Sequence, residues 1–156
     1  KHLNRTIYKT QKIIEFRKSP NITKKKGTMS NLYPHVNQIE KEKVISVLLH
    51  KLGYEIQTNK NTYFAKNVVI ALNYAKPFTI KGLEEFIIPH KRANPAKERI
   101  QLKNTHHLIQ EGLYCSGTIA GWRSQFSIAA GSGAQVATDI LTLWNNGKHT
   151  KVHDKA

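Results

Sequence analysis

The sequence predicts an α/β fold, and three observations support this prediction. Residues 44–65 contain three short β-prone runs separated by turn residues, the pattern of a small antiparallel meander. Residues 66–72, KNVVIAL, have the length of a strand and are apolar without a break from residue 68 on. Residues 112–144 start as a second apolar strand, pass through a polar turn and continue as a helix rich in glycine and alanine. Strands that lead into a helix in this way are typical of α/β proteins.

Residues 1–30 are the most basic and least patterned part of the chain, and we expect them to be a leader or linker. The apolar residues at 13–16 fit a helical face or a short strand equally well. The first residue is Lys1 rather than Met, so we expect the natural start to be processed or missing. Residues 31–156 are long enough for one domain with a hydrophobic core.

The middle of the chain predicts a series of strands. Residues 44–49 are β-prone, residues 54–58 alternate with period two, and a turn at 59–61 precedes a third strand at 62–65. These runs predict a hairpin or small meander. Residues 66–72 follow, and the unbroken apolar stretch at 68–72 favours a strand buried on both faces of a parallel sheet.

Two features of the sequence each exclude one kind of redox site. Residues 74–111 are fewer than the roughly 50 that a domain needs and contain no G-x-G-x-x-G after a strand, so we expect no separate nicotinamide-binding domain. Cys115 is the single cysteine, which excludes a C-x-x-C redox dithiol within this chain.

The segment Gly112 to Gly133, GLYCSGTIAGWRSQFSIAAGSG, joins the second apolar strand to the final helix, which we expect to run from about Ser124 to Trp144. Small residues at a strand end let a ligand approach the backbone. A helix that begins just beyond them points unpaired N–H groups and a partial positive charge at that ligand. The segment therefore predicts a binding site for a phosphate, a carboxylate or an electron-rich ring, with simple strand–helix packing as the alternative.

The same segment resembles a known family. Residues 112–118, GLYCSGT, resemble the G-[IL]-[YF]-A-A-G-D box of FAD-dependent pyridine-nucleotide-disulfide oxidoreductases of the thioredoxin reductase type. Gln125 and the run 130–133 resemble the start of the helix that follows this box. The meander and the strand ending in Ala71-Leu72-Asn73 resemble the meander and the strand ending in A-T-G of that family.

The resemblance implies a Rossmann-like, three-layer ββα FAD/NAD(P)-binding domain with a small antiparallel meander. This domain would be incomplete, because the glycine loop that holds the FAD pyrophosphate is not visible before residue 31. In the family, the acid of the box bonds the ribityl chain, and the following helix presents backbone N–H groups to the flavin. The residues expected to bind the cofactor FAD are Ala71, Asn73, Gly117, Thr118, Ile119, Ser124, Gln125, Phe126 and Ala129.

Several of these residues have a specific expected role. Thr118 stands where the family has its acid, and it can donate or accept a hydrogen bond without carrying charge. Asn73 stands where the family has a glycine, and we expect it to make the turn at positive φ. Ser124 is expected to cap the helix, Gln125 to direct its backbone N–H toward the flavin, and Phe126 to pack under the ring.

The other reactive side chains have simpler interpretations. Cys115 lies on a predicted strand, where a lone cysteine is typically a small buried hydrophobe. The pairs His106-His107 and His149 with His153 fall short of the three or four ligands of a zinc site, so we expect hydrogen-bonded or solvated histidines and no metal. The sequence shows no hydrolase motif, and we assign no catalytic side chain.

The chain carries 25 Lys and Arg against 10 Asp and Glu, a formal net charge of +15. Such a charge attracts nucleic acid or anionic lipid. The lysines are spread along the whole chain, however, which indicates compositional bias more than a designed nucleic-acid-binding surface. A phosphate-bearing cofactor is a further contributory cause.

The sequence therefore predicts an FAD-dependent oxidoreductase-like flavoprotein that lacks a nicotinamide domain and a redox dithiol. Its partners would be FAD and an unidentified electron donor and acceptor, with a homodimer left open. An inactive or truncated flavoprotein fold acting as a binding module, and a basic nucleic-acid-binding domain, are the alternatives. No run approaches the roughly 18 apolar residues of a membrane span and no signal peptide is evident, so we expect a cytoplasmic protein.

Overall fold

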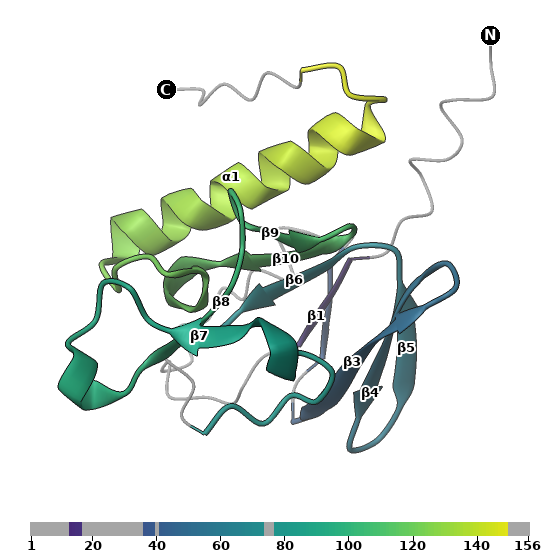
Figure 1. The fold of residues 1–156 in the computed structure, drawn as a ribbon. Helices are drawn as coiled ribbons and strands as arrows, with labels where there is room; N and C mark the ends of the chain where they lie inside the picture. Colours follow the sequence, from purple (N-terminus) through teal and green to yellow (C-terminus); the bar gives the residue numbers. More distant parts are fainter. Residues whose placement is uncertain (1–12, 17–35, 40, 74–76, 150–156) are drawn as a thin grey trace, which may run out of the picture.

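The fold is mixed α/β and consists of small sheets and, in the part of the chain that is described, one α-helix (Figure 1). The computed structural model describes residues 13–16, 36–39, 41–73 and 77–149. The α/β class predicted from the sequence is confirmed. Within these residues, no helix is both long enough and apolar enough to cross a membrane.

Part of the predicted leader forms a strand. β1 (Ile13–Phe16) pairs in parallel with β2 (Val36–Ile39), with Ile13 opposite Val36. The apolar residues at 13–16 therefore adopt the strand rather than the helical alternative. The rest of the predicted leader lies outside the described residues.

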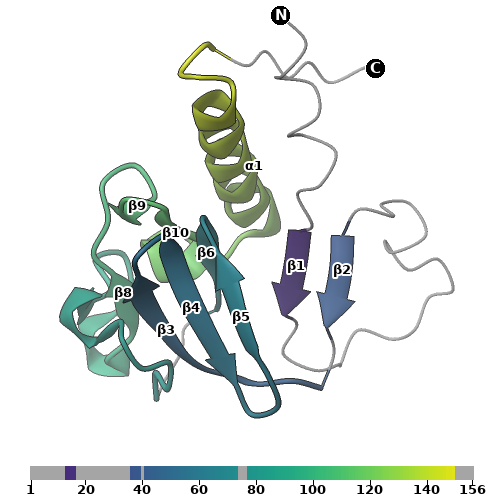
Figure 2. The same ribbon diagram turned by 90° about the vertical axis from the view of Figure 1, so that its right-hand side faces the viewer.

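The predicted meander is present. β3 (Val44–His50), β4 (Gly53–Thr58) and β5 (Thr62–Ala65) form an antiparallel sheet in that order (Figure 2). Val47 pairs with Ile56, and both side chains are buried, as the period-two alternation requires. The turn predicted at 59–61 connects β4 to β5.

A second sheet carries the predicted parallel strand. β6 (Val68–Ala71) pairs in parallel with β10 (Leu113–Ser116), and β10 pairs on its other side with antiparallel β9 (Leu108–Gln110). In the parallel pair, Ala71 lies opposite Ser116, so the carboxyl ends of both strands meet at one edge. Two segments more than 40 residues apart in sequence are thus brought together.

Burial on both faces belongs to β10 and not to β6. Leu113 and Cys115 join a large core shared with the meander, while Tyr114 packs with Val136 and Ile140 of the final helix. The prediction of a doubly buried strand at 66–72 is wrong, because the Val69 side chain is 42% exposed. The final helix lies over β10, so it does not close the second face of β6 to the same extent.

The predicted final helix is present with a later start. A short 3₁₀ helix, η5 (Gly117–Ala120), follows β10, and α1 (Phe126–Trp144) follows after a five-residue connection. Figure 1 shows α1 lying across β9, β10 and β6. The helix ends at Trp144, as expected. The N–H of Gly147 donates to the backbone oxygen of Thr142 at 2.9 Å and so satisfies one of the last carbonyl groups of the helix.

The segment between the two parallel strands forms a small unit of its own. β7 (Ile87–Pro89) and β8 (Ile100–Leu102) pair antiparallel, flanked by the 3₁₀ turns η3 (Glu84–Phe86) and η4 (Pro95–Lys97). Leu102 is fully buried in the large core. The unit therefore packs on the same core as the meander and β10, and it is a connection rather than a separate domain.

Candidate functional site

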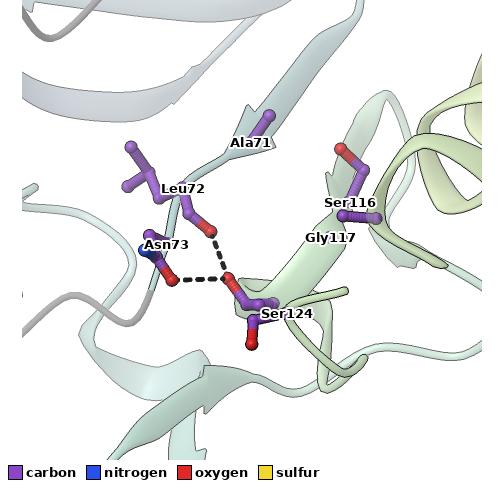
Figure 3. Close-up of a pocket in the computed structure, with 8 residues that line it drawn as sticks. Ala71, Leu72, Asn73, Ser116, Gly117 and Ser124 are labelled. Atoms are coloured by element: carbon purple, nitrogen blue, oxygen red, sulfur yellow. Dashed lines mark hydrogen bonds between the residues drawn. The ribbon is translucent and has the colours of Figure 1, made fainter. Parts of the chain in front are cut away.

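A cleft lies where the parallel strands β6 and β10 end and α1 begins (Figure 3). Its volume is about 300 Å³, at the lower end of the range of small-molecule sites. Six of the nine residues predicted to bind the cofactor line it, namely Ala71, Asn73, Gly117, Thr118, Ser124 and Ala129. Leu72 and Ser116 complete the lining.

The start of η5 is hydrogen-bonded to the end of β6. Thr118 Oγ1 donates to the backbone oxygen of Leu72 at 3.0 Å and lies 3.3 Å from Asn73 Oδ1, contacts drawn as dashed lines in Figure 3. The N–H of Ile119 donates to the same Leu72 oxygen at 3.2 Å. Thr118 is buried, and its hydroxyl proton is therefore used within the protein rather than offered to a ligand.

A buried histidine, His90, makes a hydrogen bond to the backbone of Thr118. His90 Nδ1 accepts the N–H of Arg92 at 3.2 Å, which leaves the proton on Nε2. Nε2 lies 3.1 Å from the backbone oxygen of Thr118, so it donates there. His90, which does not line the cleft, thus helps to hold the backbone of Thr118, which does.

Gly117 forms the sharp turn from β10 into η5. Its φ is +70°, a conformation that glycine adopts at little cost. Its N–H donates to Ser132 Oγ of α1 at 2.8 Å. A Cβ added at Gly117 would lie 3.9 Å from the Ala129 Cβ, an ordinary van der Waals contact, so these two small residues bring η5 close to α1.

The N-terminus of α1 faces the cleft without a capping side chain. Gln125 is the N-cap residue, and its side chain makes no capping bond. The first turn contains no acidic residue that would neutralise the partial positive charge of the helix end. This end of the helix therefore favours a ligand that carries or acquires negative charge.

The remaining predicted residues lie outside the cleft. Ile119 is fully buried in the large core, whereas Gln125 and Phe126 are exposed, Phe126 to 88%. The prediction that Ser124 caps α1 is wrong, because the helix begins two residues later and Gln125 takes that position. The non-glycine residues with positive φ in the described part of the chain do not include Asn73, which contributes its side chain instead.

Sequence reasoning missed three residues of the site. Leu72 directly follows β6 and Ser116 ends β10, so both are sequence neighbours of predicted residues, and this was the available signal. Ser132 is buried and accepts the N–H of Gly117, a contact that spans a 3₁₀ helix and a loop and leaves no trace in the sequence pattern.

Cys115 takes no part in the cleft. It is fully buried, as the sequence predicts, and loss of hydration raises the pKa of its thiol to about 12. A thiol with such a pKa is inert at neutral pH. No group of three or more histidine, cysteine or carboxylate side chains that could hold a metal ion occurs among the described residues.

No protein-family model matches the chain, and no curated protein matches it. The functional argument therefore rests on the residues and geometry of the cleft.

Proposed function

We propose that the cleft binds the flavin end of FAD and that the chain is part of a flavin-linked redox protein. The observation that carries this proposal is the convergence of six predicted residues, from two segments far apart in sequence, on one cleft. They meet at the carboxyl ends of parallel strands, where α/β proteins place their ligands. Beside the contact between Gly117 and Ala129, a cavity of about 300 Å³ remains, which is room for a ligand.

The groups that line the cleft fit a flavin. The open N-terminus of α1 would stabilise negative charge on the reduced ring. The hydroxyls of Ser116 and Ser124 face the cleft and have no hydrogen-bond partner in the described part of the chain, so they are available to a ribityl chain. Thr118 is not, because its proton is held by Leu72. The flavin itself would supply the electron transfer.

The wider fold supports the same proposal. β10 lies between a core that contains the meander and a cluster formed with α1, an order of layers compatible with a three-layer Rossmann-like FAD-binding domain. We accordingly propose an FAD-dependent oxidoreductase acting in the cytoplasm, with its electron donor and acceptor to be identified. In such a protein the side chains of the cleft position the flavin and exclude water, and none needs to exchange a proton with substrate.

The test is titration of the full chain with FAD, followed by flavin fluorescence and visible absorbance. We expect saturable quenching, and we expect Ala129→Leu to abolish it because the larger side chain would fill the cleft between α1 and Gly117. Ala130→Leu is the matched control, since Ala130 is exposed on the same helix and does not line the cleft.

Absence of saturable binding would refute the proposal for this chain. Equal loss of binding in the Ala129 and Ala130 variants would also count against it, because the effect would then not come from the cleft. Riboflavin and FMN, titrated in parallel, show which part of the cofactor is recognised. Binding of FAD with no binding of riboflavin would place the flavin outside this cleft.

A further inference from the structure

A second cleft lies on the other side of η5. Its volume is about 660 Å³, within the range of small-molecule sites. The β7–β8 unit, the turn before β9, the residue after Gly121 and helix α1 each contribute to it. The residues that carry the argument are Lys91, Arg92, Gln101, Trp122 and Asp139.

Gln101 holds an unused pair of donors in this cleft. Its side chain is only 4% exposed, and Oε1 accepts the backbone N–H of Lys91 at 2.9 Å. That contact assigns the amide orientation and directs Nε2 elsewhere. Within the described residues, Nε2 has no hydrogen-bond partner. A buried amide without an acceptor is rare in folded proteins, because such a group is satisfied by the protein, by an ordered water or by a bound ion.

The backbone next to Gln101 is shaped around its amide. A Cβ added at Gly121 would lie 2.7 Å from Gln101 Oε1 and 2.9 Å from Nε2. Gly121 also has a φ of +90°, so a larger residue is disfavoured twice. The Gln101 amide therefore packs directly against the backbone at Gly121.

Arg92 adds an oriented cation. Its Nη1 donates to the backbone oxygen of Gly121 at 2.7 Å, and its guanidinium lies 5.1 Å from the centre of the Trp122 ring. No carboxylate in the described part of the chain pairs with it, which leaves most of its five N–H donors for a ligand. The Lys91 side chain is exposed beside it on the same rim.

Asp139 of helix α1 contributes a carboxylate to the lining of this cleft. It is the single acidic residue of the lining, against the two permanent cations Lys91 and Arg92. Its carboxylate accepts Gln135 Nε2 at 2.9 Å on the helix surface. The two cations and the unpartnered Gln101 amide thus outnumber the single carboxylate of the lining. This excess of positive charge and hydrogen-bond donors favours a negatively charged ligand.

We infer that this second cleft is an oxyanion-binding site for a phosphate group, held by Gln101 Nε2 and the Arg92 guanidinium with Lys91 nearby. A phosphate offers the several acceptor oxygens that a buried amide and a planar guanidinium require. The inference is independent of flavin binding, because none of these residues lines the first cleft.

The test is isothermal titration calorimetry of the full chain with inorganic pyrophosphate at a fixed ionic strength near 0.15 M. We expect one saturable site. Arg92→Gln and Gln101→Glu should each weaken binding by at least about tenfold. Gln101→Glu keeps the acceptor for Lys91 and replaces the donors by a carboxylate oxygen. Asp139→Asn removes the opposing charge and should tighten binding.

Lys97→Gln is the matched control for loss of one positive charge, because Lys97 is exposed and lies outside this lining. It should change the affinity by less than about twofold. Equal weakening by Lys97→Gln and Arg92→Gln would show non-specific attraction to a basic protein and overturn the inference. Absence of saturable binding, or binding of malonate in place of pyrophosphate, would do the same. The Asp139 variant keeps the test decisive if Gln101→Glu fails to fold.

Discussion

Thr118 makes a hydrogen bond within the protein at a position where the sequence only resembles the flavoprotein motif. Where the resembled family has an acid, this chain has a buried hydroxyl that donates to the end of β6. A carboxylate in that position would face two acceptor oxygens, from Leu72 and Asn73. The departure from the family pattern is therefore explained by local hydrogen bonding.

Replacing Thr118 by valine should lower the free energy of unfolding by about 1–2 kcal/mol. Valine keeps the volume but removes the bond to Leu72, whose oxygen then retains only the N–H of Ile119. Urea denaturation followed by circular dichroism measures the change. Thr62→Val is the control, because Thr62 is exposed on β5 and should tolerate the exchange. Equal stability of the Thr118 variant and the parent would contradict this account.

His106 and His107 form a strained two-residue turn. Both have positive φ, at +47° and +72°, and the backbone groups of Thr105 and Leu108 exchange two hydrogen bonds of 2.9 Å across them. This is the geometry that normally selects Asn-Gly. His107 is held there by burial, by its Nδ1 contact of 3.2 Å to the Cys115 oxygen and by stacking on Trp122.

His106 is exposed and has no such compensation, so His106→Asn should raise the free energy of unfolding by about 0.5–1 kcal/mol. Asparagine adopts positive φ more readily than histidine does. Chemical denaturation measures the gain. His106→Gln is the control, since glutamine is polar but lacks this backbone preference. A Gln variant as stable as the Asn variant would show that the imidazole, and not the backbone, is the source of the strain.

At the scale of elements, helix α1 is tied to the junction between β10 and η5 by one buried hydroxyl. Ser132→Ala removes the acceptor of the Gly117 N–H and leaves that group unpaired. We expect a loss of about 1–3 kcal/mol in unfolding free energy, together with weaker flavin binding at the first cleft. Denaturation and FAD titration of the same preparation measure both.

Ser127→Ala is the control for Ser132→Ala. Ser127 lies in the first turn of the same helix and is exposed, so the exchange removes no buried bond. We expect it to leave the free energy of unfolding and the flavin affinity close to those of the parent. Similar losses in both variants would mean that helix propensity, and not the bond to Gly117, sets the stability of this junction.

The elements that could be predicted are those whose signal is local. The meander follows from period-two alternation and a polar turn, and the end of α1 from Asn145-Asn146-Gly147. Serine is a good N-cap residue, so the sequence predicts that the helix starts at Ser124. In the structure Gln125 is the N-cap residue of α1. Strands of three residues, such as β7 and β8, carry too little pattern to be distinguished from loops.

The first cleft was predictable only in part, for the same reason. Small residues mark the junction between β10 and α1 in the sequence, and the resemblance adds Ala71 and Asn73, so six of the eight lining residues are predictable. The second cleft combines a strand glutamine, a loop arginine and a tryptophan after η5, which no spacing rule connects. Its defining feature, the unpartnered amide of Gln101, exists only once the chain is folded.

For the whole molecule, one core joins the meander to the parallel strands. Val47 and Ile56 of the meander pack in the same cluster as Leu113 and Cys115 of β10. Tyr54 adds a polar connection, since its hydroxyl donates to the backbone oxygen of Glu111 at 2.7 Å. Groups in this core should therefore affect global unfolding and not only a local opening.

Cys115 allows this expectation to be tested through pH. Burial raises the pKa of its thiol from 9.0 to about 12. Below pH 9 the thiol is protonated in both the folded and the unfolded chain, and its full contribution to the free energy of unfolding is present. Between pH 9 and 12 the unfolded chain releases this proton and the folded chain keeps it, so stability falls by up to about 1.4 kcal/mol per pH unit.

Cys115→Ala removes this titration, so the stability difference between parent and variant should shrink as the pH rises from 8 to 11. Loss of hydration also raises the pKa of Tyr54, Tyr63 and Tyr114, but these groups are common to both chains and cancel in the difference. Ile70→Val, a substitution in the same core without a titratable group, should show a constant difference from the parent. If the Cys115 variant behaves like the Ile70 variant, the thiol ionises equally in both states, and the core around β10 is open to water.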